Sequence, residues 1–172
     1  MVHELDQQYS LPSDIVGPVD ISRLLRELEA LEDFLSQSAI RKPGTEMKLP
    51  PTTRALDNFA QQNKLNLLRP EDLKRAKLYF TYLKQSAPVL HISFAREPAT
   101  DFIGKLVSWL RSNLHQLILL RIGLEPALAA GCVVRTANKQ FDFSLRQHLI
   151  RQKPLLIKKI SEKANQETTH DR

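Results

Sequence analysis

The chain has 172 residues, of which 42% are hydrophobic and 6% aromatic, and its net charge at neutral pH is +6. This length allows one domain or two small ones, with a core built mostly from aliphatic side chains. No stretch approaches the ~18–20 apolar residues that cross a bilayer, and the single cysteine, Cys132, excludes an intramolecular disulfide and a thiolate metal cluster. The basic charge is compatible with nucleic acid, an anionic membrane surface or an acidic protein partner.

The N-terminal part combines an irregular segment with an amphipathic helix. Residues 1–19 have little periodicity and lack the features of a secretory signal or transit peptide, so we expect a leader on a cytoplasmic protein. From residue 21 to 40, apolar residues recur in the 3-4 alternation of a helix whose N-cap is Asp20. This stripe has two interpretations, the chain's own core and a surface for a helix of another protein. Its residues are Ile21, Leu24, Leu28, Leu31 and Leu35.

Two shorter helices are expected next. The first long helix should end at Lys42-Pro43-Gly44, and Thr52 or Thr53 should cap a short helix. Pro70-Glu71-Asp72 is a strong helix start, because proline suits the first turn and acids are favourable near the positive end of the helix dipole.

The periodicity changes after residue 86. Residues 89–94 alternate between apolar and polar side chains, which predicts a strand. A helix should begin at Thr100 or Asp101, and the apolar run 117–122 is typical of a buried strand. Residues 132–136 and 140–143 flank an Ala-Asn-Lys turn and predict a β-hairpin. Ser144 should cap a last helix that Pro154 interrupts or restarts.

These patterns predict the α+β class. We expect a leader (1–19), a helical domain of about three helices (20–86), a small C-terminal α/β domain (87–160) and a polar tail (161–172). The α/β domain should contain a sheet of three to four strands and two helices.

We predict no catalytic, cofactor-binding or metal-binding residues. The histidines have no partner at metal-ligand spacing, and the glycines form no phosphate-binding loop. Ser144 lacks the glycines of a nucleophile elbow, so helix capping explains it better. Cys132 lies in an apolar segment, where a small buried hydrophobic side chain is the usual outcome. We therefore expect a protein that is not an enzyme and uses no cofactor.

A basic stretch begins with Arg146, Arg151 and Lys153. It has three interpretations: a solvated helix face, a docking surface for a protein, and a nucleic-acid site. RNA-binding modules usually interleave such charge with aromatic residues, and only Phe141 and Phe143 lie nearby. Nucleic acid is therefore not the expected partner.

The most specific pattern lies between residues 124 and 146, where LEPALAAGCVVR is followed by NKQFDFSLR. It resembles the C-terminal signature of the ATP synthase delta subunit, whose mitochondrial counterpart is the oligomycin-sensitivity-conferring protein. That signature has an acid-Pro-x-Leu, two glycines, an aliphatic strand ending in Arg, a turn, and an Asp-Gly-Ser-aliphatic-Arg. The resemblance covers about residues 86–153, roughly 40% of the chain. The residues in register are Glu125, Pro126, Leu128, Gly131, Val133, Val134, Arg135, Lys139, Asp142, Ser144 and Arg146.

The chain also departs from this family. Ala130 stands where the family has its first glycine, and Phe143 stands at the glycine before serine, so the local turn should differ. Gly131 should allow a strand to begin where the backbone turns or packs closely, and Asp142 and Ser144 can cap the final helix. The family's early motif and its six-helix N-terminal bundle are not recognisable here.

The resemblance implies a non-catalytic stator subunit of the peripheral stalk in proton-driven ATP synthesis or hydrolysis. Its C-terminal domain would dock the stalk b subunit, and its N-terminal helices would touch the alpha subunits of the catalytic head. It would lie on the cytoplasmic side of the cell membrane, contact the membrane only through the complex and not form a homo-oligomer. Two alternatives stay open: a relative of the E-type stalk component of vacuolar-type ATPases, which has a similar C-terminal run, and a small basic RNA- or DNA-binding module.

Overall fold

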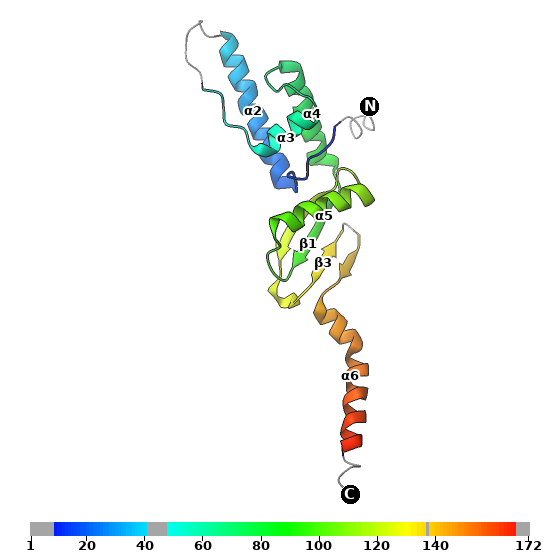
Figure 1. The fold of residues 1–172 in the computed structure, drawn as a ribbon. Coiled ribbons are helices and arrows are strands. Elements are labelled where there is room, and N and C mark those ends of the chain that lie inside the picture. The colour runs from blue at the N-terminus through cyan, green and yellow to red at the C-terminus, as the bar shows by residue number, and fades with distance from the viewer. Residues whose placement is uncertain (1–8, 41–47, 137, 168–172) are drawn as a thin grey trace. The chain divides into compact units, whose positions relative to one another are not determined.

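The structure, a computed structural model, describes residues 9–40, 48–136 and 138–167 (Figure 1). Within these residues the chain forms five α-helices, a short 3-10 turn and one four-stranded sheet with the order β2-β1-β3-β4. This is the α+β class that the periodicity predicted. The elements are α2 (Pro18–Ile40), α3 (Arg54–Gln62), α4 (Pro70–Ser86), β1 (Val89–Phe94), α5 (Thr100–Asn113), β2 (Leu119–Leu124), η1 (Pro126–Leu128), β3 (Cys132–Arg135), β4 (Gln140–Asp142) and α6 (Leu145–Glu167).

The chain divides into two compact units that alternate along the sequence. The first comprises Met1–Leu90 and Ala99–Arg121, and the second comprises His91–Pro98 and Ile122–Arg172. Helices α2 to α5 belong to the first unit, while the β3–β4 hairpin and α6 belong to the second. The predicted domains, 20–86 and 87–160, are continuous in sequence whereas these units are not, and that linear division stays a prediction.

The leucine stripe of α2 lies in the core of the first unit. Ile21, Leu24, Leu28 and Leu31 are at most 2% exposed, and the half-buried Leu35 packs against the same cluster. Side chains that are shielded from solvent cannot meet another protein while the fold persists. We therefore assign the stripe to the core and no longer propose it as a partner surface.

The leader is tied to the first unit by hydrogen bonds. The Arg111 guanidinium on α5 donates to the carbonyl oxygens of Leu11, Pro12 and Ile15, and its Nε donates to Ile118. Burial lowers the pKa of Arg111 to about 10. An arginine that joins four carbonyl groups fixes residues 11–15 more firmly than a leader without periodicity suggests.

Helix α2 begins at Pro18, three residues earlier than predicted. The Gly17 carbonyl accepts the first helical bonds, Pro18 occupies the first turn, and the Asp20 carboxylate accepts from the Gly17 amide at 2.9 Å. Asp20 therefore caps the helix from its third position and is not the N-cap. A Cβ atom on Gly17 would lie 2.5 Å from the Leu120 carbonyl oxygen, so this position requires glycine for the close approach of two backbones.

The sheet is built from a β1–α5–β2 crossover and a β3–β4 hairpin. The amides of Leu119 and Glu125 donate to the carbonyls of Pro88 and Phe94 with the same offset along the chain, which makes β2 parallel to β1. β1 pairs with β3 and β3 with β4, both antiparallel. The apolar run predicted as a strand over 117–122 is displaced to Leu119–Leu124.

Helix α6 differs most from the prediction. It passes through Pro154 without a break and continues to Glu167, where a polar tail had been expected from residue 161. The predicted helix end at Lys42-Pro43-Gly44 lies outside the described residues, as does Ala137 in the hairpin turn.

Candidate interaction surface

Residues 124–136 and 138–146 belong to the second unit. They run from the end of β2 through η1, β3 and β4 into the start of α6. Pro126 opens η1, the buried Leu128 ends it, and the exposed Arg135 ends β3. The pattern that suggested a family resemblance thus spans a single supersecondary unit.

Gly131 lets the hairpin close onto the start of α6. Its φ is +89°, and a Cβ atom there would lie 2.3 Å from the Phe143 carbonyl oxygen. Next to it, the Leu145 amide donates to the Ala130 carbonyl at 2.9 Å. Among the described residues, Ala129 has a positive φ of 61° and Phe143 does not. The chain therefore places its unusual backbone conformations before β3, not at the phenylalanine that replaces the family's glycine.

The start of α6 is capped as the sequence predicted. Ser144 is 3% exposed, and its Oγ accepts from the Gln147 amide at 3.2 Å. The Asp142 carboxylate accepts from the Ser144 amide at 2.8 Å. Hydrogen bonds from Ser144, assisted by the positive charges of Arg151 and Arg146, lower the pKa of Asp142. These side chains position the first turn of the helix.

Helix α6 exposes apolar side chains along most of its length. Its burial is described as far as Ser161, and from Leu149 to Ser161 every side chain is exposed. The large exposed apolar residues of this helix are Leu145, Leu149, Ile150, Leu155, Leu156, Ile157 and Ile160. An exposed apolar stripe of this size is typical of interaction sites. Residues 145, 149, 156 and 160 recur at helical spacing, so the sequence periodicity indicates this stripe. The stripe was not predicted because the helix was expected to break at Pro154.

The predicted basic residues divide between two sides of α6. At ~100° per residue, Arg146 and Lys153 lie within about 20° of each other around the helix, whereas Arg151 lies about 140° from Arg146. Arg151 instead lines a hollow of about 400 Å³ with Asp142 and His148. The three residues therefore do not form one surface.

An exposed aromatic pair adjoins the helix. Phe141 and Phe143 are 45% and 64% exposed, and their rings are nearly parallel at 14° with centroids 6.4 Å apart. Solvent-exposed stacked rings of this kind suit contact with a further flat or apolar group.

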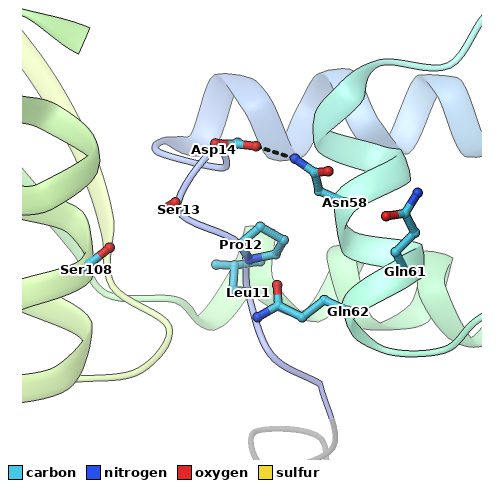
Figure 2. A pocket seen from close by; sticks show the side chains of 8 residues that line it. All are labelled: Leu11, Pro12, Ser13, Asp14, Asn58, Gln61, Gln62 and Ser108. Atoms are coloured by element: carbon cyan, nitrogen blue, oxygen red, sulfur yellow. Dashed lines mark hydrogen bonds between the residues drawn. The ribbon is translucent and has the colours of Figure 1, made fainter. Parts of the chain in front are cut away.

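A hollow of about 650 Å³ lies in the first unit, and Figure 2 shows the side chains that line it. Asn58 and Gln62 of α3 point toward the leader, and the Asn58 amide donates to the Asp14 carboxylate. Ser108 of α5 contributes a hydroxyl group. The lining combines amides, hydroxyls and one carboxylate.

Two further chemical features are the single cysteine and the side chains that could bind a metal ion. Cys132 is half-buried, and burial together with the nearby Asp142 raises the pKa of its thiol, which keeps it protonated at neutral pH. In residues 9–40, 48–136 and 138–167, no group of three His, Cys, Asp or Glu side chains could hold a metal ion. Across the same ranges, no helix has the length and apolar content to span a membrane.

No protein-family model matches the chain, and a search of curated proteins found no significant match.

Proposed function

We propose that the chain is a non-catalytic stator subunit of an F-type ATP synthase, linking the stalk b subunit to the catalytic head. The observation that carries the proposal is the segment 124–146, in which the residues resembling the delta signature are in register and belong to one hairpin–helix unit. Gly131, Asp142 and Ser144 fix backbone bends and the helix cap there. A stator resists torque through lasting contacts and needs no reactive side chain.

The second unit is the part of the chain that supports a stalk contact. It carries α6, whose exposed apolar and basic residues provide a surface for another protein. The leucine stripe of α2 no longer contributes, since it is buried. We therefore propose the b subunit as the partner of α6, and the alpha subunits of the head as partners of the first unit. The complex would lie at the cytoplasmic face of the cell membrane.

The test is purification of the tagged full-length chain from its source cells, followed by identification of the co-purifying proteins. Recovery of the b, alpha and beta subunits of an ATP synthase in fixed ratio is the expected result. The double charge reversal Arg146→Glu with Lys153→Glu should release the b subunit, while the single reversal Lys158→Glu on another side of α6 should retain it. Recovery of intact vacuolar-type subunits, or of no rotary ATPase subunit, would refute the proposal.

A second candidate, a single-stranded nucleic-acid module, is favoured by the stacked Phe141–Phe143 pair beside a basic helix. Such modules combine aromatic platforms with basic residues that follow the phosphate backbone. Gel shifts with RNA and DNA oligonucleotides over a range of salt concentrations would test it. A steep salt dependence together with loss of binding in Phe143→Ala would support it over the stator.

A further inference from the structure

The apolar residues of α6 gather on one side of the helix. At ~100° per residue, six of its seven exposed leucine and isoleucine side chains fall within an arc of about 140°. Leu155 is the exception, on the opposite side. The six residues that define this face are Leu145, Leu149, Ile150, Leu156, Ile157 and Ile160. Side chains that are 46–66% exposed along four turns form a stripe that a second helix can cover.

The charge of the helix selects the kind of partner. Residues 145–161 contain five Arg and Lys residues and no Asp or Glu. Arg146 and Lys153 lie inside the apolar arc, so a partner that covers the arc must present carboxylates to them. A second copy of α6 would bring like charges together in the centre of the interface, which opposes self-association.

A lipid surface fits this arrangement less well. In an interfacial helix the apolar face is buried deepest and the cations lie on its flanks or on the polar side. Here Arg146 and Lys153 would stand at the deepest part, and each would have to extend its side chain back to the headgroups. In a protein interface the same positions are satisfied by ion pairs within the seam.

We propose that α6 binds an acidic amphipathic helix of another chain, through Leu149, Leu156 and Ile160 and through ion pairs at Arg146 and Lys153. As a description of the stalk contact this inference rests on the proposed function, and it names the chemistry of the partner. Part of its evidence is separate, because Leu156 and Ile160 lie beyond the part of the chain that resembles the delta signature.

The test is a fluorescence-anisotropy titration of the full-length chain with a labelled synthetic helix of about four heptads. The probe has leucine at its core positions and glutamate beside them, and a matched probe has lysine in place of glutamate. The acidic probe should bind and the lysine probe should not. Circular dichroism of each variant below checks that α6 keeps its helical content.

Two pairs of variants separate this face from general charge and hydrophobicity. Leu156→Ala should weaken binding about tenfold, while Leu155→Ala, next to it but on the opposite side, should change it less than about twofold. Lys153→Glu should weaken binding by about tenfold or more, and Lys158→Glu by less than about threefold. The lysine probe should bind Lys153→Glu better than it binds the original chain.

The inference is overturned if both members of each pair weaken binding equally, since the contact would then lack a defined face. It is also overturned if phosphatidylserine vesicles or an oligo-dT strand bind in a Leu156-dependent way and the acidic probe does not. Binding of the probe without co-purification of ATP synthase subunits would reject the stator and retain this inference. If ATP synthase subunits co-purify but both members of each variant pair weaken probe binding equally, the stator proposal is retained and this inference is rejected.

Discussion

Replacing Gly131 with alanine should destabilise the second unit by about 3–4 kcal/mol. The new Cβ would lie 2.3 Å from the Phe143 carbonyl oxygen and 3.0 Å from the Ser144 Cα, with φ at +89°. A side chain at this φ costs ~1–2 kcal/mol. The overlap is relieved only by moving the start of α6. This movement strains two hydrogen bonds, from the Leu145 amide to the Ala130 carbonyl at 2.9 Å and from the Phe143 amide to the Cys132 carbonyl. Each costs ~1 kcal/mol.

Urea denaturation followed by circular dichroism measures the change, with Gly104→Ala as the matched control. Gly104 lies within α5, and a Cβ atom there meets nothing within 4 Å. That substitution should stabilise the chain by about 0.5–1 kcal/mol, because alanine favours a helix over glycine. The change from glycine to alanine should thus lower the free energy of unfolding at position 131 and raise it at position 104.

Hydrogen exchange assigns the effect to the junction, because it reports local opening amide by amide. In Gly131→Ala the amides of Phe143 and Leu145, which bond to Cys132 and Ala130, should exchange faster than in the original chain. Unchanged exchange at both amides, with an unchanged free energy of unfolding, would show that the close approach at Gly131 is not required and would refute the reasoning.

The remaining predictions concern two charged side chains, Arg111 and Asp142. Arg111→Met should destabilise the first unit by about 1–3 kcal/mol through the lost carbonyl bonds, seen as faster exchange at Ile15, and equal exchange would contradict it. Because burial lowers the pKa of Arg111 to about 10, the cost of its charge is constant below that pH and is relieved only above it, so Arg111 should add no pH dependence to stability near neutrality. The pKa of Asp142 is lowered by Ser144, so its contribution to the cap is present near neutrality and is lost as the pH falls through the lowered pKa. The acid-induced loss of α6 helicity should therefore be weaker in Asp142→Asn, and an identical titration by circular dichroism would refute this role.

Local patterns predicted the elements whose signals are strongest. The alternation over 89–94 gave β1 at its observed bounds, and Pro70 gave the start of α4, since these signals depend only on neighbouring residues. The cap formed by Ser144 was predictable for the same reason. Candidate-site residues with backbone roles, such as Gly131, were therefore recognised from the sequence.

The remaining features depend on contacts that are distant in sequence. Helix α2 begins near Gly17 because this glycine packs on the Leu120 carbonyl, more than a hundred residues away. Leu117 is buried in the core cluster but does not belong to a strand. A buried residue gives the same apolar signal in the sequence whether or not it pairs in a sheet. The strand was therefore predicted two residues too early. The sequence around Arg111 did not indicate its contact with the leader, because its pattern is that of an ordinary solvated helix residue.

The junction before α6 connects the signature residues with the interaction surface. The close approach at Gly131, the bond from Leu145 to Ala130 and the Asp142–Ser144 cap all act on the same few residues, where the hairpin passes into the helix. They fix the first turn of α6, while the side chains beyond it stay exposed for a partner. A load applied along a bound partner helix would therefore pass into the sheet through this junction. On this reasoning, residues that only bend and cap the backbone determine whether the proposed stator contact can bear force.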